Sequence, residues 1–248
     1  MASVLLVVAT TAAAEVPRVV CGGDSITFGW HGHIPGEPGG SYPLWLELLW
    51  QGNVSVSNFG VSGVTATANR AYRLTREFGM LLESRFDVAV VMLGTNDAKR
   101  KLWNEDEYVE SYLALLRLVA NSSPRGTLLV GLPPPYLGPV APQATPFTRS
   151  TWGVNSTINE LLRNAAARVA TLAGMQTIDF FASLGGANAD RALYHDAIHP
   201  NNRGYKAMAT YAFPILSAFL QPFSLRHATP KSRRRPYGVR KRRMAPRQ

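Results

Sequence analysis

The sequence predicts a three-layer α/β/α sandwich with a five-stranded parallel β-sheet, in the flavodoxin-like arrangement. Five short, apolar and largely β-branched runs are bounded by turn residues, which is typical of strands buried on both faces. Longer segments with helical spacing lie between these runs, and strands that alternate with helices form parallel βαβ units. The expected strands are residues 18–22, 54–58, 88–93, 128–132 and 177–180.

The helical segments are expected at residues 41–50, 105–120, 154–172 and 203–220. The clearest is 105–120, where an apolar stripe recurs once per turn. Asn104 and Glu107 are spaced to cap its amino end, because an Asn side chain can accept a hydrogen bond from a backbone N–H in the first turn. These helices are expected to cover both faces of the sheet.

Polar residues gather directly after the expected strands. Ser25 follows the first strand, Gly60 the second and Asn96 the third, and a turn with Asp196 and His199 follows the fifth. In parallel α/β sheets the ligand site lies beyond the carboxyl ends of the strands. The sequence therefore predicts that these residues converge on one edge of the sheet.

Composition predicts one domain, residues 15–222, with a tail at each end. The chain has 248 residues, of which 46% are hydrophobic, and this is enough for a sizeable core. The formal charge of +10 comes entirely from the carboxyl-terminal tail, since residues 226–248 hold ten Lys and Arg and no Asp or Glu. The other 16 Lys and Arg balance the 16 Asp and Glu.

The basic tail, residues 223–248, has two interpretations. One is a disordered, solvated extension. The other is a patch that holds an anionic polymer, such as acidic polysaccharide or nucleic acid, or an anionic membrane surface, with affinity that falls as salt rises. The balanced charge of the remaining chain gives no sign of nucleic-acid binding by the domain itself.

Residues 1–14 resemble a short secretory signal, apolar and ending in three alanines, although no Lys or Arg stands near the start. We expect a secreted protein; otherwise the run is an amino-terminal arm of a cytoplasmic one. Sequons at Asn53, Asn121 and Asn155 are compatible with secretion and glycosylation. No run has the 20 or so apolar residues of a transmembrane helix, and the sequence indicates no oligomeric state.

Ser25, His199 and Asp196 have the residue types of a nucleophilic hydrolase. A serine needs a base to take its proton, and the base needs a carboxylate to fix its tautomer. Asp196 and His199 are three residues apart, so one turn can present both on the same side. Asn96 ends a strongly apolar run, where its amide can donate to an anionic oxygen; Asn96 or Asp97 can instead cap a helix.

Four blocks around these residues resemble the SGNH branch of the GDSL hydrolases, in the usual order. Ile26 stands where the family's name has Leu. The resemblance covers roughly residues 17–222 and continues through Gly204-Tyr205. The blocks are Gly23-Asp24-Ser25-Ile26-Thr27, Asn58-x-Gly60-x-x-Gly63, Gly94-Thr95-Asn96-Asp97 and Asp196-x-x-His199-Pro200-Asn201.

The resemblance implies an SGNH hydrolase fold and ester hydrolysis through an acyl-enzyme, without metal or organic cofactor. It makes Ser25 the nucleophile, His199 the general base and Asp196 the residue that orients this base. The oxyanion hole would consist of the Ser25 and Gly60 backbone N–H groups and the Asn96 side chain. Asp24 we assign to organising the turn.

The remaining histidines and the single cysteine are given other roles. His195 adjoins Asp196, but its side chain is expected to point away from that of His199. His31 and His33 are expected to be loop residues, because two histidines without a third ligand make a weak metal signal. Cys21 lies in an apolar run and is expected to be a buried, inert thiol.

Three further stretches resemble a carbohydrate-directed subgroup that includes sialate-type sugar O-acetylesterases. They are residues 91–99 with Trp103, Leu132-Pro133-Pro134-Pro135 and Trp152-Gly153-Val154-Asn155. Trp103, Tyr136 and Trp152 are candidate aromatic surfaces for a sugar ring, although such residues also serve packing. We expect removal of acetyl or another short acyl group from a glycan. The alternatives are a short-chain carboxylesterase or lysophospholipase, and a non-enzymatic binding module that uses the basic tail for acidic polymers.

Overall fold

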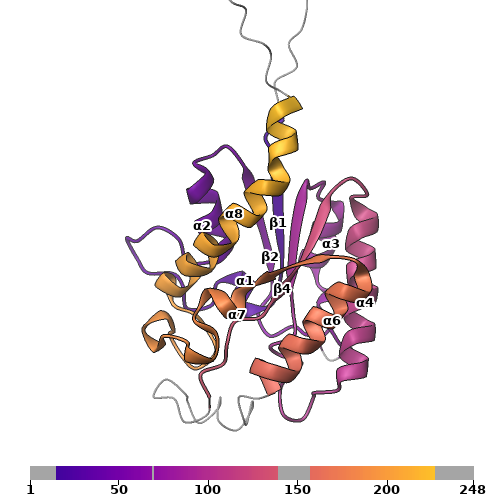
Figure 1. Ribbon diagram of the computed structural model, residues 1–248, viewed down its shortest axis with the longest axis vertical. Helices are drawn as coiled ribbons and strands as arrows, with labels where there is room; N and C mark the ends of the chain where they lie inside the picture. Colours follow the sequence, from indigo (N-terminus) through magenta and orange to yellow (C-terminus); the bar gives the residue numbers. More distant parts are fainter. Residues whose placement is uncertain (1–14, 69, 139–156, 227–248) are drawn as a thin grey trace, which may run out of the picture.

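The computed structural model describes residues 15–68, 70–138 and 157–226 (Figure 1). Five parallel strands form one sheet in the order β2-β1-β3-β4-β5, which confirms the predicted sheet. The strands are β1 (Arg18–Gly23), β2 (Ser55–Gly60), β3 (Val88–Met92), β4 (Thr127–Leu132) and β5 (Gln176–Asp179). Residues 1–14 and 227–248 lie outside the described part, so the predictions of a signal and of a basic tail stay predictions.

Helices cover both faces of the sheet and make the three predicted layers (Figure 1). One face carries α2 (Tyr42–Trp50) and α8 (Asn202–Arg226). The other carries α3 (Arg76–Glu83), α4 (Glu105–Ser122) and α6 (Arg163–Ala173). The shorter helical elements are α1 (Ser25–Phe28), η1 (Tyr72–Leu74), η2 (Thr157–Leu162), α7 (Phe180–Ser183), η3 (Gly186–Asn188) and η4 (Arg191–Leu193).

The central strand β3 shows why the sheet forms. All five of its residues are buried, and successive side chains alternate between the two faces. Val88 and Val90 pack in the cluster under α2 and α8, whereas Ala89 and Val91 pack in the cluster under α3, α4 and α6. A strand buried on both faces needs a continuous apolar run, and this is the pattern of the sequence.

The helix ends follow local sequence. As predicted, the Asn104 side chain caps α4 by accepting a hydrogen bond from the Glu107 N–H at 3.2 Å. The helix expected at 154–172 is a π-helical turn, η2, followed by α6. The helix α3 was not predicted; it has eight residues, is capped by the Thr75 side chain and buries only Phe78 and Leu81.

The strand order places a switch point between β1 and β3. From β1 the chain passes to β2 on one side, and it then returns to form β3 on the other side of β1. Helices therefore leave the two neighbouring strand ends in opposite directions and open a crevice there. Ser25 follows β1 and Asn96 follows β3, so both begin their loops at this crevice.

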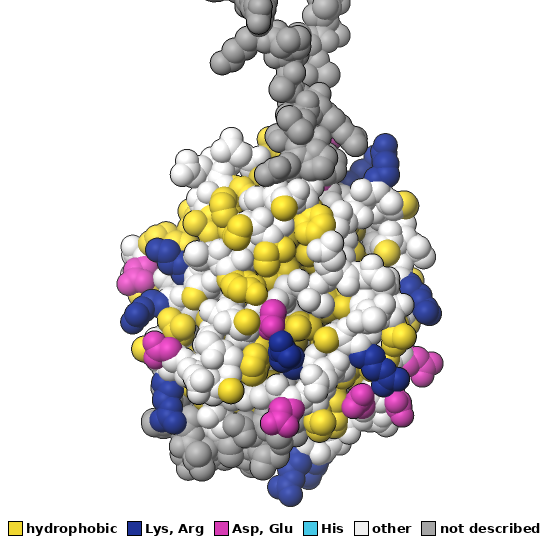
Figure 2. Space-filling view, viewed as in Figure 1, with side chains coloured by type: hydrophobic (Ala, Val, Ile, Leu, Met, Phe, Trp, Pro, Cys, Tyr) yellow, Lys and Arg dark blue, Asp and Glu magenta, His cyan; other side chains and the backbone are white. Residues whose placement is uncertain are grey.

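The described surface has no concentration of one charge on the face seen in Figure 2, where Lys and Arg are interspersed with Asp and Glu. This fits the balanced charge of residues outside the tail. Within residues 15–68, 70–138 and 157–226, no helix is both long and apolar enough to span a bilayer. Cys21 is fully buried, as expected, and burial raises the pKa of its thiol to about 12.

Candidate active site

Ser25 is positioned by a tight connection between β1 and α1. A side chain at Gly23 would approach the Met92 carbonyl oxygen to 2.4 Å, so the strand can end there only with glycine. Asp24 then caps α1, its Oδ1 accepting a hydrogen bond from the Ile26 N–H at 2.9 Å. Ser25 is the first residue of α1, and its N–H therefore has no partner within the helix.

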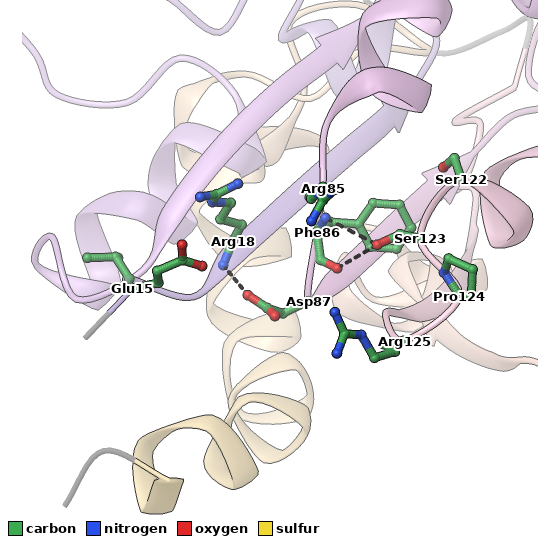
Figure 3. A pocket seen from close by; sticks show the side chains of 10 residues that line it. Glu15, Arg18, Arg85, Phe86, Asp87, Ser122, Ser123, Pro124 and Arg125 are labelled. Carbon is green, nitrogen blue, oxygen red and sulfur yellow. Dashed lines mark hydrogen bonds between the residues drawn. The ribbon is translucent and has the colours of Figure 1, made fainter. Parts of the chain in front are cut away.

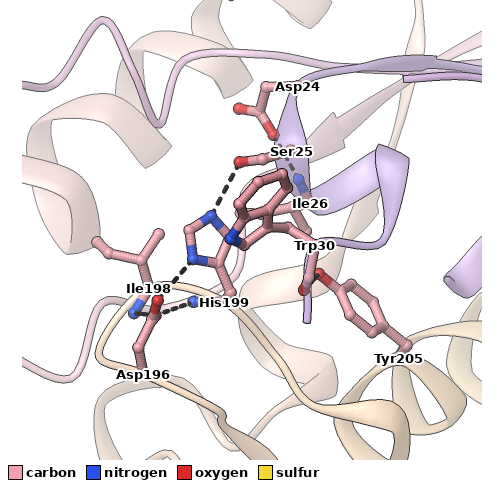
Figure 4. Close-up of polar contacts among 8 residues, drawn as sticks. All are labelled: Asp24, Ser25, Ile26, Trp30, Asp196, Ile198, His199 and Tyr205. Atoms are coloured by element: carbon pink, nitrogen blue, oxygen red, sulfur yellow. Dashed lines mark hydrogen bonds and ion pairs between the residues drawn. The ribbon is translucent and has the colours of Figure 1, made fainter. Parts of the chain in front are cut away.

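Ser25, His199 and Asp196 form a connected set (Figure 4). Ser25 Oγ lies 3.0 Å from His199 Nε2, and His199 Nδ1 lies 2.8 Å from Asp196 Oδ2. Because an ionised carboxylate only accepts, Nδ1 carries the proton and Nε2 is free to accept the serine hydroxyl proton. The side chains of His199 and Asp196 are 14% and 15% exposed, so the base is shielded yet reachable.

Asp196 is held in its ionised form. Its Oδ1 accepts the N–H groups of Ile198 and His199, each at 2.7 Å, so the turn closes around the carboxylate. Burial alone would raise the pKa of Asp196. The hydrogen bond from the His199 ring, the attraction of its charge and the two N–H groups outweigh burial and lower this pKa.

The residues after His199 fix the start of α8. Asn201 Oδ1 accepts the N–H groups of Arg203 and Gly204 at 3.0 and 3.1 Å, and Asn201 Nδ2 donates to the Ala192 carbonyl at 2.9 Å. A side chain at Gly204 would come within 2.2 Å of the Leu193 carbonyl oxygen. The Asn201 and Gly204 positions therefore lock the His199 turn onto the helix.

Asn96 and Asp97 hold the loop that follows β2. The buried Asn96 donates from Nδ2 to the Val64 carbonyl at 2.9 Å. The buried Asp97 accepts the N–H groups of Ala66 and Thr67, both at 3.0 Å. Asp97 was expected only as a possible helix cap. Its hydrogen bonds to Ala66 and Thr67, about 30 residues earlier in the chain, have no local signal in the sequence.

The N–H of Gly60, a predicted oxyanion donor, has a hydrogen-bond partner in the structure. The Gly60 N–H donates to Asn58 Oδ1 at 2.9 Å, so it is not a free donor. Gly60 is instead required for packing, since a side chain there would lie 2.2 Å from the Phe28 backbone nitrogen. Gly63, next to Val64, has a left-handed φ of 80°. Among the described residues its N–H makes no intramolecular hydrogen bond.

Asp24 is an unusual neighbour for the nucleophile. It is fully buried, and its Oδ2 has no hydrogen-bond partner among the described residues. Burial raises the pKa of Asp24 to about 6, although the Ile26 N–H and the charge of His199 act in the opposite direction. The turn-organising role expected for Asp24 is therefore accompanied by an electrostatic cost.

Two of the three predicted aromatic surfaces, Trp103 and Tyr136, pack in or against the hydrophobic core. Trp103 is partly buried, with its ring 5.6 Å from that of Tyr108 and packed against the core. Tyr136 is 2% exposed and belongs to the core, which corrects the expectation that its ring faces a sugar. Trp152 lies outside the described residues.

His195, His31 and His33 lie where they were expected, His195 turned away from Ser25 and the other two outside helices and strands. His199, not His195, reaches Ser25. The His195 ring stacks instead on the His31 ring, with centroids 3.8 Å apart. His31 therefore lies beside the triad, while His33 is an exposed loop residue as expected. The part of the chain that the structure describes contains no group of three His, Cys, Asp or Glu positioned to hold a metal ion.

A cavity of about 730 Å³ lies at the opposite edge of the sheet (Figure 3). Arg18 begins β1 and Asp87 precedes β3, so the cavity borders the amino ends of the strands. The Arg18 N–H donates to Asp87 Oδ2 at 2.8 Å, and Arg85 and Arg125 also line the cavity. The triad and this cavity are separate features of the molecule.

The comparison with known families agrees with the triad geometry. The model of the GDSL-like lipase/acylhydrolase family matches residues 21–207, about three quarters of the chain. The chain belongs to this family. The expectation of a GDSL, SGNH-type hydrolase is thereby confirmed, and the matched range includes every residue of the set in Figure 4.

Relatives of this GDSL hydrolase include an acetylxylan esterase from Xylanibacter ruminicola, 29% identical over 202 residues. The match covers 77% of this chain but only 41% of the relative. A carbohydrate acetylesterase family member from Sinorhizobium meliloti has a TM-score of 0.65, at 17% identity, over 83% of this chain and 99% of its own. An aryl esterase from M. smegmatis has a TM-score of 0.65, at 21% identity, over 82% and 100%. These structures share the fold.

Proposed function

We propose that this GDSL hydrolase is a serine esterase that removes acetyl or other short acyl groups from a carbohydrate through an acyl-enzyme. The main support for this proposal is the pair of contacts between Ser25 Oγ and His199 Nε2, at 3.0 Å, and between His199 Nδ1 and Asp196 Oδ2, at 2.8 Å. Family membership supports the chemistry, and the names of the acetylxylan esterase and the carbohydrate acetylesterase support the substrate class.

In the first half of the proposed reaction, His199 Nε2 takes the Ser25 proton while Oγ attacks the ester carbonyl carbon. The resulting imidazolium is stabilised by the ionised Asp196. His199 then gives this proton to the leaving sugar oxygen, the carbon–oxygen bond breaks, and Ser25 carries the acyl group. In the second half, water loses a proton to His199 and attacks; the acid leaves and Ser25 regains its proton.

The developing oxyanion needs donors placed before the reaction. We propose the Ser25 N–H, the second N–H of the Asn96 amide and the Gly63 N–H for this role. The Ser25 N–H has no partner within α1, which it begins, and Asn96 already fixes the loop through Val64. Gly63 replaces Gly60, whose N–H is engaged by Asn58.

The test is a screen of acetylated xylo-oligosaccharides, acetylated monosaccharides and simple acyl esters of increasing chain length. We expect acetyl esters to be cleaved by the intact protein and not by the Ser25→Ala variant. A serine-directed phosphonate should label Ser25 alone. An unlabelled Ser25 in active enzyme would falsify the nucleophile, and a clear preference for long acyl chains would favour the lysophospholipase alternative.

We also propose, from sequence alone, that residues 1–14 direct secretion and that the basic tail binds anionic polymer or membrane. Because α8 ends at Arg226, deletion of residues 227–248 leaves the described helices intact. Salt-sensitive binding to an acidic polysaccharide or to anionic vesicles that disappears on this deletion would support the tail proposal. Equal binding by both forms would reject it.

A further inference from the structure

Two large aromatic side chains close to the nucleophile are exposed, Phe28 at 52% and Trp30 at 42%. Single exposed apolar residues are common, so exposure by itself indicates little. The backbone of Trp30, however, is fixed on both sides. Its N–H donates to the Ser25 carbonyl at 2.9 Å, and its carbonyl accepts from the Tyr205 hydroxyl at 2.9 Å. The indole therefore stands at a defined place beside the triad (Figure 4).

Ring contacts connect Trp30 to the base. The His31 ring lies edge-on to Trp30, with centroids 5.4 Å apart, and stacks on His195 at 3.8 Å. The same ring is edge-on to His199 at 5.9 Å. His31 also has a left-handed φ of 61°, a conformation that costs energy in a residue other than glycine. The strained residue is thus the one that joins Trp30 to the site.

The segment that follows Trp30 is anchored to the helix that follows the base. The buried Asn202 begins α8, three residues after His199. Its Oδ1 accepts the Gly40 N–H at 3.0 Å and the Trp45 indole N–H at 2.9 Å. The start of α8 therefore holds both the loop that follows Trp30 and the turn that contains His199, and this fixes the position of the one relative to the other.

The mechanism decides which part of the substrate the rings would meet. His199 must protonate the leaving oxygen, so the alcohol portion of the ester lies beside this imidazole. The acyl carbonyl oxygen points instead toward Asn96 and the donors of the oxyanion hole. Trp30, His31 and His195 adjoin His199 and hence border the leaving alcohol.

The chemistry of these rings fits a sugar. A pyranose has an apolar face of C–H groups that can lie on an indole, and a rim of hydroxyls that needs donors and acceptors. His31 is exposed, and its slight burial, followed by the neighbouring His195 and His199, lowers its pKa. A neutral imidazole both donates and accepts hydrogen bonds.

We propose that Trp30 is the platform for the sugar ring of the leaving group, and that the His31–His195 stack is the polar wall of the same subsite. The inference rests on the proposed esterase function and names a subsite for its substrate. It replaces Trp103 and Tyr136, whose rings pack in or against the core.

The test compares Trp30→Ala and Trp30→Phe with Tyr211→Ala, which removes another exposed aromatic ring, 39% exposed, from α8. Each is assayed on acetylated xylo-oligosaccharide, on 4-nitrophenyl acetate and on ethyl acetate, which has no ring. For Trp30→Ala we expect the ratio of kcat/KM on the saccharide to that on ethyl acetate to fall about tenfold, through KM. Trp30→Phe should retain most of the ratio, and Tyr211→Ala all of it.

The wall is tested with His195→Phe, which keeps a ring for stacking on His31 and removes the nitrogens. We expect the same ratio to fall about fivefold, the value of one hydrogen bond. An undiminished ratio in this variant would remove the wall from the proposal. A selective loss on 4-nitrophenyl acetate in Trp30→Ala would make the subsite an aryl site and overturn the sugar assignment, as would equal losses on all three esters.

Binding separates this inference from the esterase proposal. In the Ser25→Ala background, titration of unacetylated xylo-oligosaccharide should give a dissociation constant about tenfold weaker after Trp30→Ala. Esterase activity with saccharide binding indifferent to Trp30 would reject the subsite alone. Absence of hydrolysis on any ester by the intact protein would reject the esterase, while Trp30-dependent binding would still support the subsite.

Discussion

Replacing Asp24 with Asn should make stability less sensitive to pH. Asp24 is fully buried and its Oδ2 has no partner among the described residues, so ionisation places an unpaired charge in the protein interior. Asn is nearly the same shape and can still accept the Ile26 N–H that caps α1 at 2.9 Å. The substitution therefore removes the titration while it keeps the cap.

The magnitude follows from the pKa. Burial raises the pKa of Asp24 from 3.8, the value of an exposed aspartate, to about 6. Each unit between the folded and unfolded pKa is worth 1.36 kcal/mol, so ionising the folded protein costs about 3 kcal/mol. Because the folded pKa is the higher one, this stability is fully present below pH 4 and is lost as pH rises through about 6.

The assay is urea unfolding of both proteins, followed by tryptophan fluorescence, at several pH values between 4 and 7.5. We expect the free energy of unfolding of Asp24→Asn, relative to the parent protein, to increase by about 2.4 kcal/mol between pH 4 and 7, because the unfolded carboxyl is already partly ionised at pH 4. The new amide N–H changes the free energy of unfolding by the same amount at every pH, so it does not affect the pH dependence of the difference between the two proteins. The titrations of all other groups are common to both proteins and cancel in this difference. A difference that stays the same at every pH would refute a buried carboxyl that ionises near 6.

Two further substitutions test the loop after β2. Asn96→Ala should lower kcat by roughly 10² to 10³, the usual loss for one oxyanion donor. Asn104→Ala is its control, because it removes an amide whose recorded hydrogen bond caps α4 through the Glu107 N–H; unchanged kcat in Asn96→Ala would refute the donor role. Asp97→Ala should lower the free energy of unfolding by about 2 kcal/mol, since the Ala66 and Thr67 N–H groups lose a charged acceptor while the burial cost of the carboxyl is relieved. Denaturant unfolding measures this change, and a more stable variant would show that burial outweighs the two hydrogen bonds.

The central strands β1, β3 and β4 were predictable because each is a short apolar run that is buried on both faces, whereas the edge strands β2 and β5 are more exposed. β3 is the clearest case, and the helix α4 was predictable from its Asn104 cap and apolar stripe. The helix α3 was not, because its eight residues bury only Phe78 and Leu81 and make no sustained stripe. A helix or strand that buries more of its side chains thus has a clearer pattern in the sequence.

Within the site, sequence indicated the residues that act through their own chemistry. Ser25, Asp196 and His199 have side chains suited to one task, and the structure brings them together. Backbone donors carry no such signal: neither Gly60 nor Gly63 has a side chain that marks its role, and it is the hydrogen bond from the Gly60 N–H to Asn58 that distinguishes the two as donors.

Long-range contacts explain the aromatic errors. Tyr136 and Trp30 are both aromatic residues near polar segments, yet one lies in the core and the other stands beside His199. The position of Trp30 depends on the loop that contains it. Tyr205 and Asn202, more than 160 residues away in the sequence, hold this loop against α8 by hydrogen bonds. No local window contains that information.

The two carboxylates that act on His199 have pKa values displaced in opposite directions, and this separates their contributions. Asp196 accepts the ring N–H and two backbone N–H groups, so it is ionised at neutral pH and stabilises the imidazolium by direct contact. Asp24 accepts only the Ile26 N–H among these hydrogen bonds, and its ionisation lowers the free energy of unfolding. Its negative charge nevertheless attracts His199. If that attraction assists catalysis, Asp24→Asn should gain stability above pH 6 and lose turnover there, whereas a carboxyl that serves only the turn would give the gain without the loss.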